Sequence, residues 1–198
     1  MKNTPELYAL ILAGGKSTRM GTDKGLLEYH GMPQRDYLYR IAETVCQKSF
    51  LSVRSEQQSN IPQSFNLIVD QDVHKGPFNG MLSAHQRFPD VAWLVLACDL
   101  PLLDSDALKL LQSNRNHHKM ATAFATKQSG LPEPLIAIWE PQGLKSAVTY
   151  LKTARGSCPR KFLINSDITL VHPAHDEVLY NANSLEERDF AHSKLSRA

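Results

Sequence analysis

The chain has 198 residues, of which 42% are hydrophobic and 21% are charged, and its formal net charge at pH 7 is +2. This length suits a single domain, residues 1–198, that buries roughly 70% of the surface of its unfolded chain. A charge so close to zero, without a cluster of Lys or Arg, argues against nucleic acid or a membrane as partner. The three cysteines lie far apart without C-x-x-C spacing, which argues against a disulfide framework or a zinc site. No apolar run approaches the ~20 residues of a membrane span, so we expect a cytoplasmic protein.

Apolar runs that predict strands alternate along the chain with patterns that predict helices. The predicted strands are Tyr8–Leu12, Phe50–Arg54, Leu67–Val69, Val91–Ala97, Met120–Ala125, Leu135–Trp139 and Ile168–Val171. The predicted helices are Gln34–Val45, Asn79–Phe88, Asp106–Ser113 and Leu144–Lys152, and a capping box at Ser184 begins a last one. The polar residues 55–64 and the Gly-Leu-Pro turn within 128–133 are expected to be loops. This alternation predicts an α/β fold, a three-layer sandwich around a mostly parallel, twisted sheet.

Residues 10–27 hold most of the functional information. An apolar strand runs into Ala13-Gly14-Gly15, and two cations, Arg19 and Lys24, follow at fixed offsets. Glycine allows a ligand to approach the backbone closely, with N–H groups directed at phosphate oxygens. The two cations can neutralise phosphate charges that backbone dipoles alone hold weakly. We therefore predict a nucleoside triphosphate site whose turn comprises the backbone of Leu12, Ala13, Gly14 and Gly15.

Two familiar phosphate motifs do not fit this turn. A Walker A loop requires a glycine where Leu10 stands, inside the predicted strand. A dinucleotide fingerprint requires G-x-G-x-x-G, whereas the glycines here are adjacent and the next one is Gly21. Both readings are excluded.

Two aspartates follow other predicted strands. Asp70 ends one strand, and Asp99 follows the apolar run WLVLAC. Ligands of open parallel sheets bind beyond the carboxyl ends of the strands, so the glycine turn, Asp70 and Asp99 are expected on one rim. A carboxylate there can hold Mg²⁺, which takes hard oxygen ligands and only one or two from protein. The alternatives are a helix cap or turn role for Asp99 and a surface turn for Asp70.

The pattern L-A-G-G-x-S-x-R-M-G-x-D-K-x-L-L matches residues 12–27 at every specified position. It resembles the signature of the molybdenum cofactor guanylyltransferase group within the family of sugar- and cofactor-nucleotide pyrophosphorylases. Three further segments match this family: Gly76–Met81, Cys98–Pro101 and Asn181–Glu187. The resemblance extends over residues 6–190 and implies a Rossmann-like nucleotide-binding topology of the glycosyltransferase-A-like type.

Roles for individual residues follow from this resemblance. It implies that Arg19, Lys24 and Asp99 are catalytic and that Asp99 and Asn183 bind the metal, with Asn181 as the substitute. The nucleotide would be bordered by Asp70, Gly76, Gly80 and, near the base, Ser55. Both asparagines can instead simply shape a turn, and Gly80 can simply permit tight helix packing. Ser55 stands where the family often carries asparagine, which weakens the assignment of guanine more than that of nucleotidyl transfer.

The activity that the resemblance implies is Mg²⁺-dependent transfer of GMP from GTP to the phosphate of molybdopterin, or of its molybdenum-loaded form, with release of pyrophosphate. Such a phosphate nucleophile is already ionised near neutral pH and needs no general base. Transient contact with enzymes that deliver or accept the cofactor is a further expectation. Glu133 can contact donors on the pterin ring, and Arg155, Arg160 and Lys161 can meet the acceptor phosphate or simply be solvated. The alternatives are a CTP-dependent cytidylyltransferase, a sugar-phosphate nucleotidyltransferase and a catalytically inactive nucleotide-binding regulator.

Overall fold

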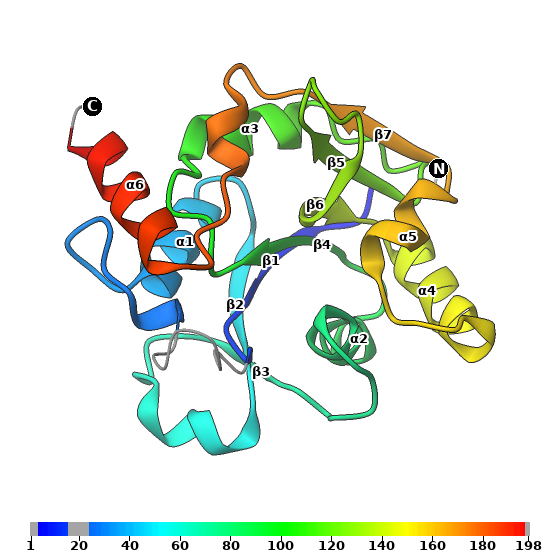
Figure 1. The fold of residues 1–198 in the computed structure, drawn as a ribbon. Helices are drawn as coiled ribbons and strands as arrows, with labels where there is room; N and C mark the ends of the chain where they lie inside the picture. Colours follow the sequence, from blue (N-terminus) through cyan, green and yellow to red (C-terminus); the bar gives the residue numbers. More distant parts are fainter. Residues whose placement is uncertain (1–3, 16–23, 197–198) are drawn as a thin grey trace.

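The computed structural model describes residues 4–15 and 24–196, which fold around a seven-stranded sheet (Figure 1). The strand order across the sheet is β3-β2-β1-β4-β6-β5-β7. Each strand lies within three residues of its predicted bounds. The strands are β1 Leu7–Leu12, β2 Lys48–Val53, β3 Leu67–Val69, β4 Ala92–Ala97, β5 Ala121–Ala125, β6 Pro132–Trp139 and β7 Ile168–Val171.

The sheet is mostly parallel, as predicted. Strand β1 pairs in parallel with β2 and β4, β2 with β3, and β5 with β7. Strand β6 is antiparallel to both of its neighbours, β4 and β5. Because of this reversal, β6 begins at the edge where the parallel strands end.

Helices cover both faces of the sheet and make the predicted three layers (Figure 1). Helices α1 (Gln34–Ala42) and α3 (Ser105–Ser113) pack on one face, and α2 (Pro77–Arg87), α4 (Pro141–Thr153) and α5 (Pro159–Ile164) pack on the other. Helix α6 (Leu185–Leu195) follows the predicted cap. Two local predictions were wrong. The short helix α5 was not predicted, and Ser55–Asn60 forms a 3-10 helix in place of a loop.

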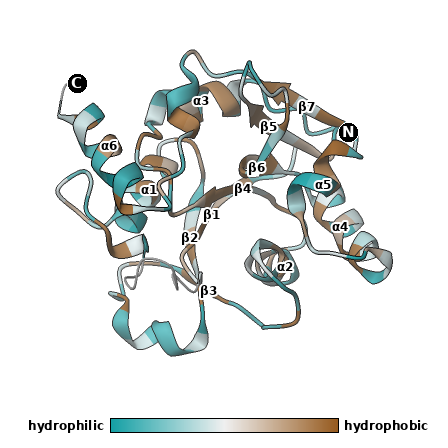
Figure 2. Ribbon diagram, viewed as in Figure 1, coloured by the Kyte–Doolittle hydropathy of each residue, from teal (hydrophilic) through white to brown (hydrophobic). Residues whose placement is uncertain are grey.

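The central strands alternate between the two faces because successive side chains of a strand point in opposite directions. In β1, Leu7, Ala9 and Ile11 join the core beneath α1 and α3, while Tyr8 and Leu10 join the core beneath α2, α4 and α5. Each large apolar side chain buried in this way contributes about 1.5–3 kcal/mol. Figure 2 shows the hydrophobic colour along β4 and β5 and the hydrophilic colour over residues 55–60. Within the described ranges, no helix is both long and apolar enough to cross a lipid bilayer.

The topology creates a crevice at the carboxyl ends of β1 and β4. The chain leaves β1 toward β2 on one side and returns to β4 on the other, so the connections diverge at this point. Open α/β sheets bind ligands at such a switch point. The glycine turn follows β1 and Asp99 follows β4, so both begin at this crevice.

Candidate active site

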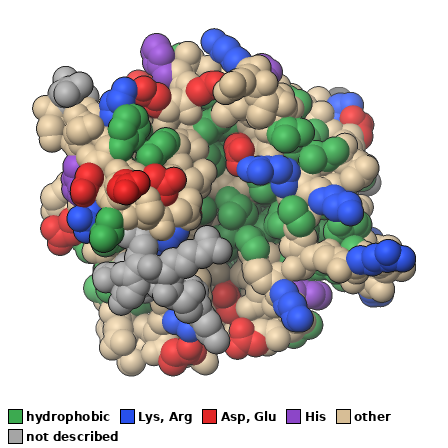
Figure 3. Space-filling model, viewed as in Figure 1, with side chains coloured by type: hydrophobic (Ala, Val, Ile, Leu, Met, Phe, Trp, Pro, Cys, Tyr) green, Lys and Arg blue, Asp and Glu red, His purple; other side chains and the backbone are tan. Residues whose placement is uncertain are grey.

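A cavity of about 600 Å³ occupies the carboxyl edge of the sheet. Figure 3 shows a hollow on this face with apolar side chains in its floor. Most of the predicted site residues line the cavity, although they come from four separate parts of the sequence. These residues are Leu12, Ala13, Gly14, Gly15, Lys24, Asp70, Gly76, Gly80 and Asp99.

The glycine turn is fixed from two sides. The backbone N–H of Ala13 donates to the Ser52 carbonyl at 2.9 Å, and the Gln57 amide donates to the Ala13 carbonyl at 3.2 Å. A Cβ at Gly14 would lie 2.7 Å from Oδ2 of Asp70, whereas a Cβ at Gly15 would meet nothing within 4 Å. Gly14 therefore permits the turn to pack on a carboxylate, and Gly15 presents open backbone to the cavity.

Asp99 is held at the end of β4 by its backbone. The N–H of Ala182 donates to the Asp99 carbonyl at 2.9 Å, and the buried Gln34 side chain donates to the Leu100 carbonyl at 2.8 Å. The first of these bonds also brings Asn183 beside Asp99. Helix α6 fixes the same segment, because the Glu187 carboxylate accepts hydrogen bonds from the N–H groups of Asn183 and Ser184. These bonds lower the pKa of the Glu187 carboxyl.

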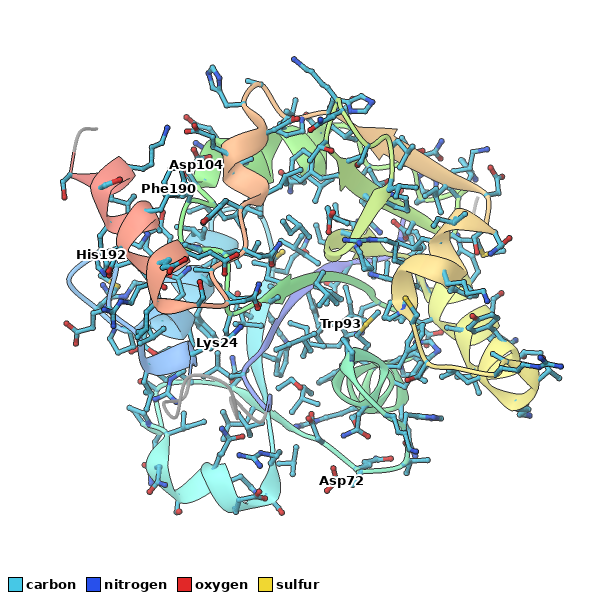
Figure 4. All side chains as sticks on the ribbon, viewed as in Figure 1. Lys24, Asp72, Trp93, Asp104, Phe190 and His192 are labelled. Carbon is cyan, nitrogen blue, oxygen red and sulfur yellow. The ribbon has the colours of Figure 1, made fainter. Side chains whose placement is uncertain are left out.

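Lys24 joins these two segments. Its Nζ lies 3.3 Å from Oδ2 of Asp99 and 2.6 Å from Oδ1 of Asn183. The Lys24 and Asp99 side chains are 22% and 21% exposed, so the ion pair lies partly out of solvent at the cavity. Figure 4 shows Lys24 near the point where α6 begins. The structure therefore brings together distant parts of the sequence, since Lys24 is 75 positions from Asp99 and 159 positions from Asn183.

The oxygens of Asp99 and Asn183 fit a hard divalent cation. Oδ1 of Asp99 is buried, and among the described residues it has no hydrogen-bond partner. A carboxylate and an amide oxygen are ligands that Mg²⁺ accepts, and Mg²⁺ typically uses only one or two protein carboxylates. Within the same part of the chain, no three His, Cys, Asp or Glu side chains cluster as a metal site. The amide nitrogen of Asn181, the substitute ligand, donates to the Leu179 carbonyl at 3.2 Å.

Asp70 lies at the opposite wall, packed under α2. Its Oδ1 accepts a hydrogen bond of 2.6 Å from the Ser52 hydroxyl. Burial raises the pKa of the Asp70 carboxyl above its ordinary value, and the Ser52 hydrogen bond partly offsets that rise. A Cβ at Gly80 would lie 2.2 Å from Oγ of Ser52 and 3.2 Å from Oδ1 of Asp70. Gly80 thus lines the cavity and also permits α2 to pack closely on this pair.

The loop before α2 contributes the next part of the wall. Gly76 precedes the helix with φ +65°, a conformation that favours glycine, and Pro77 begins the first turn. Asp72 also has a positive φ of 55°, and its carboxylate accepts a hydrogen bond from Asn79 at 3.3 Å. Asp72, which Figure 4 labels on this loop, lines the cavity along with His74 and Lys75. The N-terminus of α2 here favours negative charge.

Among the described residues that were predicted for the site, Ser55 and Asn183 do not line the cavity, although Asn183 contacts Lys24, which does. Ser55 is exposed in the 3-10 helix and directs its hydroxyl at Glu56, and among the described lining residues Arg54 stands in its place. Arg19 lies outside the described residues. Of the basic residues that were predicted to meet the acceptor phosphate, Arg160 pairs with Glu133, whereas Arg155 and Lys161 are exposed.

The sequence reasoning missed several residues that shape the site. Arg54 directly follows β2, so the rule that selected Asp70 and Asp99 from strand ends applies to it equally. Gln57 accepts a hydrogen bond from the Arg54 N–H at 2.9 Å while it donates to Ala13, so it ties β2 to the glycine turn. No sequence signal marks that link, because it joins residues 44 positions apart.

Comparisons with known proteins bear on this geometry. A family model described as the MobA-like NTP transferase domain matches residues 9–183. The molybdenum cofactor biosynthesis bifunctional protein of Synechocystis sp. is 35% identical over 188 residues, which are 94% of this chain and 54% of that protein. The chain therefore spans about half the length of this relative. The molybdenum cofactor guanylyltransferase of Pseudomonas fluorescens (strain SBW25) is 30% identical over 178 residues, which are 88% of each chain.

Solved structures share the fold. Molybdopterin-guanine dinucleotide biosynthesis protein A from Archaeoglobus fulgidus matches with a TM-score of 0.75 and 18% identity, over 96% of this chain and 100% of that one. A nucleotidyl transferase from Methanothermobacter thermautotroptrophicus matches with a TM-score of 0.76 and 14% identity, over 97% and 98% of the two chains. At these identities the likeness shows the α/β architecture alone.

Proposed function

The chain belongs to the MobA-like NTP transferase domain family, and on that premise we propose that it transfers GMP from GTP to the phosphate of molybdopterin, or of its molybdenum-loaded form, and releases pyrophosphate. The observation that carries the proposal is the contact of Lys24 with both Asp99 and Asn183, at the cavity that Lys24 and Asp99 line together with the glycine turn. The names of the relatives supply the nucleotide and the acceptor.

The reaction joins two anions, so the protein must suppress repulsion and hold the reacting groups in line. An oxygen of the acceptor phosphate attacks the α-phosphorus, a new P–O bond forms, and the bond to the leaving pyrophosphate breaks. The nucleophile is already ionised near neutral pH, so no side chain needs to remove a proton. Positioning contributes about 7–11 kcal/mol in the best intramolecular analogues, and charges directed at the developing negative oxygens usually contribute most.

Each part of the site has a role in this scheme. The N–H groups of Gly14 and Gly15 hold the triphosphate, because the N–H of Ala13 is already bound to the Ser52 carbonyl. Lys24 faces the α-phosphate, because a phosphate placed at Asp99 lies within reach of an ammonium that is 3.3 Å from that carboxylate. Arg19 engages the β- and γ-phosphates. Binding of the negatively charged triphosphate is further favoured by the N-terminus of α2.

Nucleotidyltransferases of this family generally use a divalent metal, and we assign Mg²⁺ to this chain. Asp99 and Asn183 would hold it, since one offers a buried oxygen without a partner among the described residues and the other an exposed amide oxygen. When bound, the ion supplies neutralising charge to phosphate oxygens.

The test is a pyrophosphate-release assay with Mg²⁺, molybdopterin and either GTP, CTP or ATP. We expect release with GTP at a rate at least about tenfold above that with CTP. A faster reaction with CTP would replace guanine by cytosine in the proposal and leave nucleotidyl transfer intact. No release with any triphosphate would reject the enzyme and favour a nucleotide-binding regulator.

A further inference from the structure

We propose that Glu133, held in place by Arg160, binds the hydrogen-bond-donor edge of the acceptor's pterin ring. This inference rests on the proposed function, because that function supplies a pterin as the acceptor. It adds a specificity residue on the side of the cavity away from Asp70 and the glycine turn.

The reversed direction of β6 places Glu133 at the correct edge of the sheet. The strand begins at Pro132 and runs antiparallel to β4, with Ile136 paired to Leu96. That pairing ends at Ile136, and Glu133 lies three residues nearer the start of β6, where it pairs with Phe124 of β5 beyond an irregularity in the register. The first residues of β6 therefore lie on the rim that carries the metal-binding carboxylate.

Glu133 is close in the chain to a residue of the cavity wall. Leu135, two positions further along β6, lines the cavity. Glu133 and Leu135 are both half-buried, whereas Pro132 and Pro134 are buried. A ligand that extends from the nucleotide cavity past Leu135 therefore reaches the carboxylate of Glu133.

The segment before α5 lies near the loop that precedes α2. A Cβ built on Gly76, a lining residue, would lie 3.9 Å from the Ser157 hydroxyl. Three residues later, Arg160 stands in the first turn of α5. Figure 1 shows α5 beside β6, next to α4.

Arg160 fixes the Glu133 carboxylate and leaves part of it available. Its Nη2 lies 2.5 Å from Oε2 of Glu133, and its Nε donates to the Pro132 carbonyl at 3.1 Å. The guanidinium is thus bound to two consecutive residues of one strand. Among the described residues, Oε1 of Glu133 accepts no hydrogen bond, and the side chain is 20% exposed.

A pterin matches this arrangement chemically. Its 2-amino group and the adjacent ring N–H form a pair of parallel donors, and an ionised carboxylate is an acceptor-only group with about four lone-pair sites. Arg160 uses one of those sites, so others remain for the ring. Charge-assisted hydrogen bonds of this kind are roughly twice as strong as neutral ones. A ring that carries a carbonyl in place of the amino group presents an oxygen to the carboxylate and is repelled.

The experiment compares two probes that differ at this one group. Pterin and lumazine have the same two-ring frame, but lumazine carries a carbonyl where pterin carries the 2-amino group. Binding of each is measured by fluorescence titration at saturating GTP and Mg²⁺; neither probe carries a phosphate, so no transfer occurs. We expect the wild-type protein to prefer pterin by at least about tenfold.

Variants assign that preference to Glu133. Glu133→Gln keeps the size of the side chain but offers both a donor and an acceptor, so the preference should fall to within about twofold. GTP affinity, measured on the same protein, should stay within about twofold and shows that the variant is folded. The matched control is Glu177→Gln, which makes the same change in an exposed ion pair with Lys194 at 2.6 Å and should keep the full preference.

Failure of this inference differs from failure of the proposed function. Equal binding of the two probes by wild type, or an unchanged preference in Glu133→Gln, would show that Glu133–Arg160 is a solvated ion pair only, even while GMP transfer proceeds. Absence of GMP transfer with a retained pterin preference would reject the transfer reaction and leave the pterin subsite standing.

Discussion

The packing at Gly80 yields the most quantitative prediction. An added Cβ would lie 2.2 Å from Oγ of Ser52, 3.0 Å from Cδ2 of Leu12 and 3.2 Å from Oδ1 of Asp70. Distances below 3 Å require something to move. The nearest atom is a hydroxyl that donates a 2.6 Å hydrogen bond to Asp70, so relief of the clash breaks that bond or displaces α2.

The expected cost of Gly80→Ala follows from these contacts. Overpacking of a core by one methyl group costs about 1–3 kcal/mol, and loss of a hydrogen bond to a charged group costs about 1.5–3 kcal/mol. The better helix propensity of alanine returns about 0.5–1 kcal/mol. We therefore expect the free energy of unfolding to fall by about 2–5 kcal/mol.

Urea denaturation of a double-mutant cycle tests this reasoning. Ser52→Ala removes the clashing oxygen, so Gly80→Ala should cost less than about 1 kcal/mol in that background, with a coupling energy of at least about 1 kcal/mol. Gly156→Ala is the control, since a Cβ there meets nothing within 4 Å. Additivity of the two substitutions within about 0.5 kcal/mol would refute the proposed contact.

Three further predictions concern charges. Lys24→Met should lower kcat/KM for transfer by about 10²–10³-fold, because the phosphates lose a preorganised charge. The free energy of unfolding should change by less than about 1 kcal/mol. Near wild-type turnover would exclude the proposed role. Glu140 is fully buried and pairs with Arg115 at 2.7 and 2.9 Å. Glu140→Gln should therefore lower the free energy of unfolding, measured in urea, by about 3–5 kcal/mol and leave kcat/KM of the folded protein unchanged. A loss below about 1 kcal/mol would contradict this. Burial raises the pKa of the Asp70 carboxyl, so this group holds its proton more tightly in the folded protein than in the unfolded chain. The wild-type protein should therefore lose stability as the pH rises from about 4 through the raised pKa. Asp70→Asn lacks this loss, so its unfolding free energy relative to wild type should increase over that window, and parallel pH profiles would contradict the assignment.

The fold follows closely from the sequence because the strands are marked by local patterns. All seven apolar runs became strands, and the capping box at Ser184 begins α6. The direction of β6 was not predictable from its residues, since an apolar run reads alike in both directions and only tertiary pairing decides between them. Helix α5 was missed because it begins with Pro159 and has only six residues, and six residues are too few to show a helical periodicity.

The site was predictable where a residue follows a strand and unpredictable where its partner is distant. The glycine turn, Asp70 and Asp99 each end a strand, and all line the cavity. The bond from Lys24 to Asn183 spans 159 residues, and the one from Ser52 joins β2 to the residue that follows β3, so neither follows from a local pattern. Ser55 was selected because it occupies a position where the resembled family often carries asparagine near the base. In the structure it is the first residue of the 3-10 helix, and its side chain is exposed.

The most direct test of the central claim follows the α-phosphorus itself. GTP labelled at that phosphorus is incubated with Mg²⁺ and molybdopterin, using wild type and the Asp99→Asn variant. The account predicts label in the pterin product with wild type and a rate lower by at least about 10² in the variant, because the amide lacks the charge of the carboxylate. Transfer at the wild-type rate by Asp99→Asn would show that the carboxylate at the end of β4 plays no part in the reaction.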